Sequence, residues 1–406
     1  MDWKLIMLLL AGAGFLYNLI LHLVQYRSAN NPTPANVADV YDAETYRRWK
    51  AYCAAKSRLH IFSGIASFLL LCLLLTNAHA AFAAWFPSNI FMQLTAVVVL
   101  QTVADALLGV VFDYVETMVI EEKYGFNRST LKTFVADQIR GLLLNLLLAF
   151  ALMSALAGLH LWLGDWVVLL FVVVLFGFTL AVSFLYPIFS RIGNKFTPLE
   201  DGQLKDRLME LLTKHGYQVK AIEVMDASRR TTKLNAYFTG FGKLKTIVLY
   251  DNLVNAMTTD EICAVFAHEL GHGLHKDVLK QQLLNLLNLL LIALAAWVVI
   301  RQPDMHLAFG FDAVNYGFAY LLLSFLLGLV QPLTGILTAA YSRKAEYRAD
   351  RQAVAEGYGA ALGEALKKLS RENFSHLAPS KLLVVLEYSH PPLSQRLEAL
   401  DEALKQ

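Results

Sequence analysis

The chain has 406 residues, of which 56% are hydrophobic and only 17% are charged. Its mean hydropathy of +0.46 is above the usual range of soluble proteins and indicates an integral membrane protein. A formal net charge of +2 is too small to suggest nucleic acid as a partner. The three cysteines, Cys53, Cys72 and Cys263, are far apart, which argues against a disulfide scaffold and against a cysteine-rich metal site.

Seven apolar segments are long enough, or nearly long enough, to cross a bilayer, which requires about 20 helical residues. In chain order we place them near 3–25, 59–82, 90–112, 139–161, 165–189, 281–300 and 312–340. No small-residue cleavage site follows the first apolar segment, so we interpret it as a retained span and not as a signal peptide. The sequence therefore predicts a mainly α-helical protein with seven transmembrane helices.

Lys and Arg are concentrated in the segments that would lie on one side of the membrane. They are frequent between residues 26 and 58, after the third span, in the hydrophilic stretch 191–280 and after residue 341. The opposite side carries only Lys4 and Arg301. The positive-inside rule therefore predicts that the N-terminus lies outside and that both hydrophilic stretches lie in the cytoplasm.

Several predicted spans contain polar residues, among them Asp105 in the middle of the third span and Asp113 at its end. Ionisable groups at membrane depth usually face a bundle interior or a water-filled cavity. In the alternative interpretation, Asn and Gln residues link helices by hydrogen bonds, and Asp113, Glu116 and Asp312 lie at membrane interfaces. Asp105 is the hardest to explain in this second way, because it lies mid-span.

The hydrophilic stretch 191–280 has mixed secondary-structure signals. A helix is expected from Pro198 to about Gly216, a plausible glycine C-cap, and a strand from Val219 to Met225. Thr231 to Phe238 and Leu244 to Tyr250 are typical of a β-hairpin. The sequence Thr258-Thr-Asp-Glu fits a capping box, which predicts a helix that runs through His275.

The segment FAHELGHGLHKD, residues 266–277, places His268 and His272 four residues apart on that helix. Residues at this spacing are neighbours on one helical face, so their imidazoles can bind one metal ion. Glu269 is rotated by one position and can reach a water on the metal without being a ligand. A catalytic zinc needs a third protein ligand. Because a motif this short also arises by chance, the site depends on finding that ligand.

The segment SRKAEYRAD, which follows the seventh span, offers Glu346 and Asp350 on one helical face. One carboxylate can bind the metal while the other accepts the free N–H of a ligating histidine. The alternative is an ordinary charged helix in which Arg343, Arg348 and Arg351 pair with these acids. Spacing alone favours this alternative.

Two further segments offer groups that suit peptide hydrolysis. Asn235, Ala236 and Tyr237 lie in the predicted hairpin, whose edge can hold an extended peptide through main-chain hydrogen bonds; Asn235 could equally cap or bulge the strand. His390 precedes two prolines that stop a helix, and Arg396 follows at the start of an amphipathic helix. A positioned histidine and arginine can stabilise an oxyanion.

In this order along the chain, NAYFTGF, HELGH, the Glu346-x-x-x-Asp350 segment and SHPPLSQRLEAL resemble the type I CAAX prenyl proteases, a family of integral-membrane zinc endopeptidases. The segments EKYGFNRSTLKTFVADQIRGLL (122–143) and NKFTPLEDGQLKDRL (194–208) resemble the same family. The resemblance extends from about Tyr41 to Leu400. It implies seven spans that enclose a water-filled chamber, with the metal site at its cytosolic end, and gives Asp105 and Asp113 a lining role.

The resemblance also implies roles for individual residues. It implies that one Zn²⁺ per chain is bound by His268, His272 and Glu346. Glu269 would be the general base, and Asp350 would orient a ligand. The residues that would contact the substrate or its transition state are Asn235, Ala236, Tyr237, His390 and Arg396.

These expectations divide the chain into four parts. Residues 1–190 form a membrane region with five helices, 191–280 a zincin-like α+β block with a small sheet, 281–341 two further spans, and 342–406 a C-terminal catalytic segment. Eukaryotic family members trim prenylated CAAX proteins. The Leu-rich spans and compact loops of this chain are typical of a bacterial inner-membrane protein, for which cleavage of membrane or misfolded peptides is expected.

The expected partners are a peptide or membrane-protein substrate and the lipid bilayer, with no nucleic acid; the oligomeric state stays open, with a monomer as one option. Two alternatives remain. One is a smaller heat-shock-type membrane metalloprotease, which shares the HExxH motif and a glutamate ligand. The other is a zinc-binding channel or transporter without enzymatic activity, although such a site has no need for Glu269.

Overall fold

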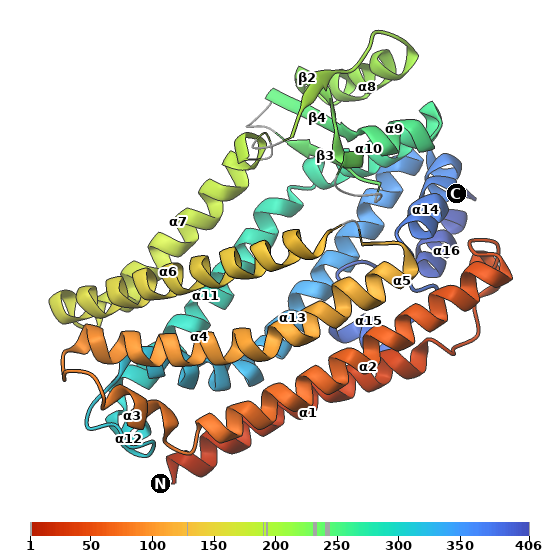
Figure 1. Cartoon of the computed structure of the whole chain (residues 1–406). Helices are drawn as coiled ribbons and strands as arrows, with labels where there is room; N and C mark the ends of the chain where they lie inside the picture. Colours follow the sequence, from red (N-terminus) through yellow and green to blue (C-terminus); the bar gives the residue numbers. More distant parts are fainter. Residues whose placement is uncertain are drawn as a thin grey trace. The chain divides into compact units, whose positions relative to one another are not determined.

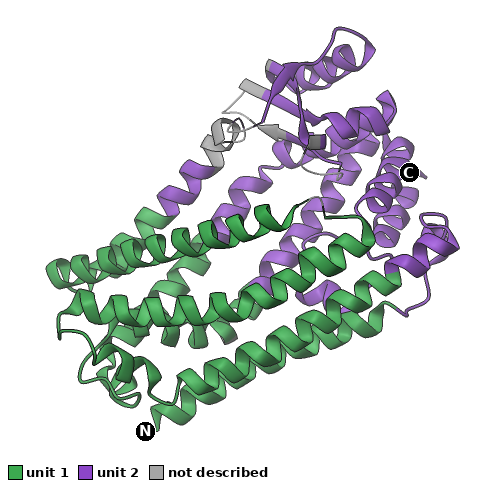
Figure 2. Ribbon diagram, in the orientation of Figure 1, with its two compact units in different colours: residues 1–29, 50–175, 286–334 green, residues 30–49, 176–285, 335–406 purple. Residues whose placement is uncertain are grey.

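The computed structural model describes residues 2–127, 129–189, 191, 194–229, 234–239 and 244–405. The chain divides into two compact units (Figure 2). Unit 1 comprises Met1–Ala29, Lys50–Leu175 and Leu286–Thr334. Unit 2 comprises Asn30–Trp49, Phe176–Asn285 and Gly335–Gln406.

Long apolar helices dominate unit 1, and four of them have residues in both units (Figures 1 and 2). The long helices that contribute to unit 1 are α1 (Trp3–Ser28), α2 (Ala43–Leu74), α4 (Ile90–Tyr114), α6 (Leu131–Leu163), α7 (Trp166–Phe189), α11 (Asp277–Arg301) and α13 (Tyr316–Ala355). Side chains cap several N-termini: Asp2 accepts a hydrogen bond from the backbone N–H of Leu5, and Thr130 accepts one from Thr133. Such caps satisfy N–H groups that have no partner inside the helix.

Short helical segments connect the long helices of unit 1. They are α3 (Ala78–Ala83), the π-helical η2 (Val115–Glu121), α5 (Glu122–Tyr124) and α12 (Pro303–Leu307). The core of this unit includes Phe309, Phe311 and Phe318, with ring centroids 5.1 Å apart for Phe309 and Phe318 and 4.8 Å apart for Phe311 and Phe318.

Within the described residues, five helices are long and apolar enough to cross a membrane: α1, α2, α4 with its π-helical continuation, α6 and α11. A sixth is added if the two parts of α13, which are bent by 54°, form one span. The apolar part found in α7, Trp166–Val182, is shorter. The structure therefore supports an integral membrane protein with five or six spanning helices, and the number seven stays a prediction.

The predicted end of the second span was wrong. Helix α2 ends at Leu74 and not near residue 82, because Asn77 adopts a left-handed conformation with φ of 115° before α3 begins. Its start lies at Ala43, so the charged segment before the span is helical and continuous with it. Lys and Arg in this segment do not interrupt the helix, because both are good helix formers.

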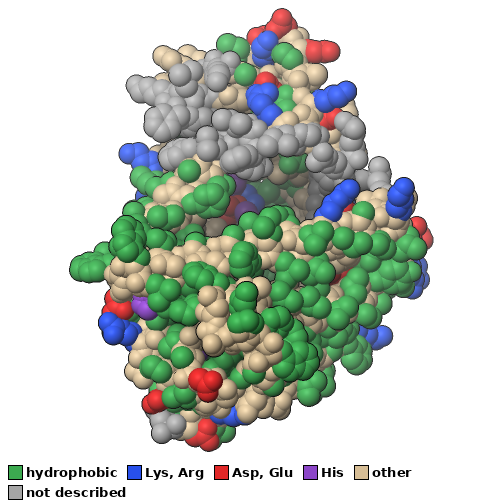
Figure 3. All heavy atoms as spheres, turned by 60° about the vertical axis from the view of Figure 1, so that its left-hand side comes forward, with side chains coloured by type: hydrophobic (Ala, Val, Ile, Leu, Met, Phe, Trp, Pro, Cys, Tyr) green, Lys and Arg blue, Asp and Glu red, His purple; other side chains and the backbone are tan. Residues whose placement is uncertain are grey.

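Large apolar side chains are exposed along these helices. Leu107 on α4 is 68% exposed, and Leu147 on α6 and Phe178 on α7 are each 63% exposed. Figure 3 shows a face of the molecule on which hydrophobic side chains predominate. Apolar surface of this extent is rare on soluble monomers and suits contact with lipid.

Unit 2 contains a four-stranded sheet with the order β1-β2-β4-β3 (Figure 1). The strands are β1 (Phe196–Pro198), β2 (Gln218–Met225), β3 (Ala236–Thr239) and β4 (Leu244–Tyr250). β2 and β4 are parallel, whereas β1 and β3 pair antiparallel with β2 and β4. The predicted hairpin is confirmed by the pairing of Tyr237 with Val248; the predicted residues Thr231, Thr232 and Lys233 of its first strand lie outside the described residues.

The helices of unit 2 are α8 (Gln203–Lys214), α9 (Asp251–Ala256), α10 (Thr259–Leu274), α14 (Gly359–Glu372), α15 (Lys381–Leu386) and α16 (Leu393–Leu404), together with the 3-10 turns η1 (Ala35–Val37) and η3 (Ala227–Arg229). Helix α8 was predicted to start at Pro198, and this start was wrong. Pro198 ends β1, which pairs with β2, and α8 begins only after Gly202, whose φ is 152°.

Helix α10 is the structural centre of unit 2. The predicted capping box is present, with the Thr258 side chain bonded to the Glu261 N–H and the Glu261 side chain bonded to the Thr258 N–H. Almost every residue from Glu261 to Gly271 is buried. Residues of α8, the sheet and α10, such as Leu212, Ile247 and Phe266, share one core cluster. Burial on several sides fixes the orientation of this helix and of its polar residues.

Gly271 brings α10 and α13 close together. A Cβ atom at this position would lie 2.9 Å from the Cα of Ala349 on α13, a distance that side chains do not tolerate. Glu346 and Asp350 lie on the same helix within one turn of Ala349. The glycine between the two histidines therefore permits the approach that carries these carboxylates to the histidines.

Candidate metal centre

Three predicted ligands converge in unit 2. His268 and His272 lie on α10 with ring centroids 4.8 Å apart and ring planes at 88°. Glu346 on α13 places Oε2 3.5 Å from the Nε2 of His268, and Oε1 3.4 Å from the Nε2 of His272. One ligand atom from each residue lies within 4.8 Å of the other two. The separation of 78 residues in sequence is closed by the packing of α10 on α13.

The spacing of these atoms fits a metal ion. Ligand atoms about 2.1 Å from a tetrahedral zinc are about 3.4 Å from one another, which matches the two distances to Glu346. Burial disfavours a charged His272, yet its hydrogen bonds with Glu346 and Asp277 raise the pKa of this imidazole to about 9. The negative potential behind this shift favours any cation, and two imidazoles with a carboxylate are a ligand set that suits zinc.

Asp350 lies behind the first histidine. Its Oδ1 is 2.9 Å from the Nδ1 of His268, and it is 2% exposed. Because an ionised carboxylate can only accept hydrogen bonds, Nδ1 is the donor, and the lone pair on Nε2 is left for a ligand role. Arg396 donates from Nε to Asp350 Oδ2 at 2.9 Å and from Nη2 to Oδ1 at 2.5 Å.

Arg396 and His390 both reach the carboxylate of Glu346. The Nη1 of Arg396 is 3.2 Å from Oε2, and the Nδ1 of His390 is 3.1 Å from Oε1. Arg396 is only 9% exposed, whereas the His390 side chain is 66% exposed. The loop before His390 is held by Arg343, whose Nη1 donates to the carbonyls of Val384 and Tyr388 at 2.7 Å each.

The charged-helix alternative for Glu346 and Asp350 does not describe the contacts found. Arg343 binds backbone carbonyls, and Arg348 donates to Asp277 at 2.6 Å. The two acids pair instead with histidines and with Arg396. Helical spacing could not reveal this choice, because every one of these partners comes from a distant segment.

A cavity of about 320 Å³ lies over the ligand groups. The three ligands line it together with Glu269, Asn235, Ala236, His390 and Arg396. Its apolar wall includes Leu362, Leu366 and Leu369. All but one of the substrate-contact and catalytic residues predicted from sequence therefore share one cavity with the metal ligands, whatever their roles.

Tyr237 is the exception, because alternate residues of a strand face opposite sides. It packs in the cluster of Met225, Ala227 and Val248 on the other face of the sheet. Asn235 precedes β3 and accepts a hydrogen bond from the Ala236 N–H at 2.9 Å. The Asn235 side chain therefore bonds the backbone at the start of β3, as a capping residue does, and it also lines the cavity.

Asp277 lies at this centre, but it was not predicted from the sequence. Its Oδ2 is 3.0 Å from the Nδ1 of His272, so the second histidine has a carboxylate behind it as the first one does. Its place in sequence, five residues after His272, does not fit the spacing of three or four that joins side chains on one helix. It is the last residue of the segment FAHELGHGLHKD, but this position alone does not indicate a contact with His272.

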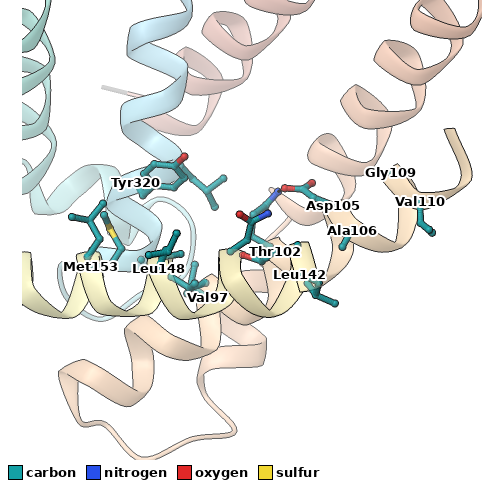
Figure 4. Close-up of a pocket in the computed structure, with 18 of the residues that line it drawn as sticks. Val97, Thr102, Asp105, Ala106, Gly109, Val110, Leu142, Leu148, Met153 and Tyr320 are labelled. Atoms are coloured by element: carbon teal, nitrogen blue, oxygen red, sulfur yellow. Dashed lines mark hydrogen bonds between the residues drawn. The ribbon is translucent and has the colours of Figure 1, made fainter. Parts of the chain in front are cut away.

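The polar residues of the third span line a separate cavity in unit 1, of about 600 Å³. Figure 4 shows Asp105 among its lining residues. Gln101 donates to Asp105 at 2.9 Å, and Gln138 donates to Asp113 at 3.1 Å. Asp105 and Asp113 thus face a cavity, as the first interpretation predicted, while a hydrogen bond of 3.2 Å from Thr334 to Asn288 links two helices.

Comparisons with known proteins cover almost the whole chain. Residues 198–404 match the model of peptidase family M48, and residues 22–191 match the CAAX prenyl protease N-terminal region with five membrane helices. CAAX prenyl protease 1 of Saccharomyces cerevisiae is 31% identical over 98% of this chain and 95% of that protein. The homolog of Oryza sativa is 30% identical over 96% and 95%, and the human homolog is 28% identical over 90% and 88%.

A solved structure agrees with these matches. The crystal structure of Saccharomyces mikatae Ste24p superposes with a TM-score of 0.85 at 30% identity, covering 99% of both chains. Fold, sequence and the clustered histidines and glutamate all lead to one assignment. The chain belongs to peptidase family M48, among the CAAX prenyl proteases, and is an integral-membrane metalloendopeptidase.

Proposed function

We propose that this protein hydrolyses peptide bonds with one zinc ion per chain, bound by His268, His272 and Glu346. The observation that carries the proposal is the convergence of three ligand atoms within 4.8 Å of one another in a cavity that Glu269 also lines. Two histidines and a carboxylate are the ligand set of several zinc peptidases, in which the fourth position is left to water.

A zinc ion in this site would polarise the scissile carbonyl and lower the pKa of the attacking water to about 7. Glu269 accepts the proton of that water and later delivers it to the leaving amine. Asp350 keeps the Nδ1 of His268 protonated, so that Nε2 stays available as a ligand. Arg396 and His390 help to neutralise the oxyanion of the transition state, and the exposed His390 can reach it from the rim of the cavity.

The substrate is held along β3, the last strand in the order of the sheet. An extended peptide pairs with the backbone of Ala236 and Tyr237, and Asn235 adds a side-chain contact. The apolar wall with Leu362, Leu366 and Leu369 supports binding of an apolar substrate side chain. We therefore propose CAAX-type peptides, the class in the names of the relatives, or unfolded membrane-associated peptides as substrates.

For the membrane arrangement we propose seven spans, with α7 and the bent α13 completing the set, around a water-filled chamber that Asp105 and Asp113 line. The N-terminus lies outside a bacterial inner membrane, and the zincin-like block 191–280 and the segment 342–406 lie in the cytoplasm. This arrangement divides the chain into four parts: a membrane region (1–190), the zincin-like block (191–280), two further spans (281–341) and the C-terminal segment (342–406). A reporter fused after Gln406 and accessible only from the outer face would contradict this orientation.

The direct test of the mechanism is the substitution Glu269→Gln. The variant should bind one zinc per chain as the wild type does, and its rate of cleavage of a CAAX-type test peptide should fall by at least about 10³-fold. Glu261→Gln, in the capping box of the same helix, is the matched control and should keep the wild-type rate. Cleavage by Glu269→Gln at the wild-type rate would show that another group is the base.

The two alternative functions, a heat-shock-type protease and a zinc-binding channel or transporter, are less well supported. A smaller heat-shock-type protease does not account for the match of residues 22–191 to the CAAX-type membrane region. A zinc-binding channel or transporter would lose nothing in Glu269→Gln, because no proton is transferred there. The comparison of zinc content with cleavage in the two glutamate variants therefore separates these classes.

A further inference from the structure

The connection between α10 and α11 brings a carboxylate back to the metal helix. Helix α10 ends at Leu274, His275 is its C-cap, and Lys276 adopts a left-handed conformation with φ of 54°. This conformation is unfavourable for a residue with a side chain. It turns the chain so that Asp277, the first residue of α11, lies beside His272, with Oδ2 3.0 Å from Nδ1.

Asp277 is itself held from α13. The hydroxyl of Tyr341 donates to its Oδ1 at 2.8 Å, and Nη2 of Arg348 donates to the same oxygen at 2.6 Å. Arg348 also donates to the Tyr341 hydroxyl at 3.3 Å and lies 5.5 Å over its ring. Asp277 is 6% exposed, so this carboxylate is a buried anion with a fixed orientation.

The arrangement repeats the one behind the other histidine. There Asp350 contacts the Nδ1 of His268 and is bonded by Arg396. Each histidine thus has a buried carboxylate and an arginine behind its Nδ1, but the two carboxylates come from different helices. Carboxylates placed in this way fix the tautomer of ligating histidines and increase metal affinity.

We propose that Asp277 is a positioning residue for the metal centre: it holds His272 with Nδ1 protonated and Nε2 directed at the metal. Through Tyr341 and Arg348 it ties this histidine to the helix that carries Glu346. The inference rests on the proposed zinc site, and it goes beyond that site because it assigns the orientation of His272 to the turn between α10 and α11.

The test is zinc affinity, measured on the purified full-length protein in detergent by competition with a chelator of known affinity. Asp277→Ala should bind zinc about 10- to 100-fold more weakly than the wild type. Asp277→Asn keeps an acceptor oxygen and the shape of the side chain, so its loss should be smaller. Glu261→Gln is the matched control, since this carboxylate on α10 pairs with Lys368 at 2.7 Å and lies in the capping box, and it should keep the wild-type affinity.

Two further measurements separate positioning from a merely structural role. The Co²⁺-loaded Asp277→Ala protein should show an altered visible absorption spectrum, because the spectrum reports the ligand geometry. Removal of the buried Asp277 carboxylate should also lower the melting temperature of the metal-free protein, because Arg348 and Tyr341 lose a partner. The rise in melting temperature on adding zinc should shrink as well, which a merely structural role does not predict. Should Asp277→Ala fail to fold, Tyr341→Phe removes a single donor to Asp277, and a few-fold loss of zinc affinity is then expected.

The outcomes are distinct from those that test the proposed function. Wild-type zinc affinity and an unaltered Co²⁺ spectrum in Asp277→Ala, or in Tyr341→Phe if the alanine variant does not fold, would overturn this inference and leave the zinc peptidase intact. A lower melting temperature of the metal-free variant with unchanged zinc affinity would also overturn it, because Asp277 would then only stabilise the turn. A wild-type protein that binds no zinc would overturn both.

Discussion

Two aspartates, Asp105 in unit 1 and Asp350 at the metal centre of unit 2, have opposite surroundings. In unit 1, Asp105 is exposed to a cavity, and its hydrogen bond comes from Gln101, a neutral amide. In unit 2, Asp350 is 2% exposed and is bonded by Arg396 and His268. A carboxylate in a cavity can keep water, whereas a buried one requires charged partners. The difference predicts where substitutions are tolerated and where they are not.

The largest effect on stability is expected at Asp350. Substitution to Asn leaves the buried guanidinium of Arg396 without one of its two carboxylates, and breaking a buried pair of this kind costs about 3–5 kcal/mol. The free energy of unfolding in detergent should fall by that amount. Asp105→Asn is the matched variant in unit 1, and its change should be below about 0.5 kcal/mol. Equal losses in the two variants would contradict the comparison.

A smaller loss of stability is expected at Gly271, where α10 and α13 are in close contact. In Gly271→Ala the new methyl group would meet the backbone of Ala349 at 2.9 Å, and overpacking of this kind costs about 1–3 kcal/mol. The rate of peptide cleavage should fall as well, because a shift of α13 displaces Glu346 from the two histidines. Gly64→Ala on α2 is the control, since an added Cβ there meets nothing within 4 Å. Thermal unfolding and peptide cleavage of both variants measure the difference.

The smallest expected effect is a pH dependence of the stability that comes from Glu356, the residue after the end of α13. Burial of Glu356 opposes its ionisation, but hydrogen bonds from Lys214 and His215 outweigh this and lower its pKa below the ordinary 4.5. A carboxyl with a lowered pKa in the folded state stabilises the protein above the unfolded value and loses this as pH falls. The stability of the wild type should therefore decrease below about pH 4.5.

The variant Glu356→Gln isolates that contribution. It should be less stable than the wild type at pH 7 and should lose less on acidification, which thermal unfolding at several pH values can measure. If both proteins show the same slope between pH 5 and pH 3, Glu356 is not the group responsible.

The parts of the fold that were predictable depend on local patterns. Apolar segments identify the spans, the capping box at Thr258 and Glu261 identifies the start of α10, and spacing of four places His268 and His272 on one face. Boundaries set by a single residue were not predictable. Asn77 ends the second span early through a left-handed conformation, which many residues in its place would avoid.

The candidate site was predictable to the extent that its residues carry a local pattern or a family resemblance. Glu346 and Asp350 could be chosen over an ordinary charged helix only by resemblance, since their partners His268, His272 and Arg396 are distant in sequence. Asp277 carried neither signal. Its contact with His272 depends on the left-handed turn at Lys276, and three-dimensional packing decides such contacts.

The central claim is that His268, His272 and Glu346 together bind one metal ion. Metal analysis and X-ray absorption spectroscopy of the purified wild type and of Glu346→Gln test it directly. The wild type should contain one zinc per chain with two imidazole ligands and oxygen ligands, and Glu346→Gln should lose most of its zinc. A Glu346→Gln protein that retains a full complement of zinc with an unaltered absorption spectrum would contradict the claim.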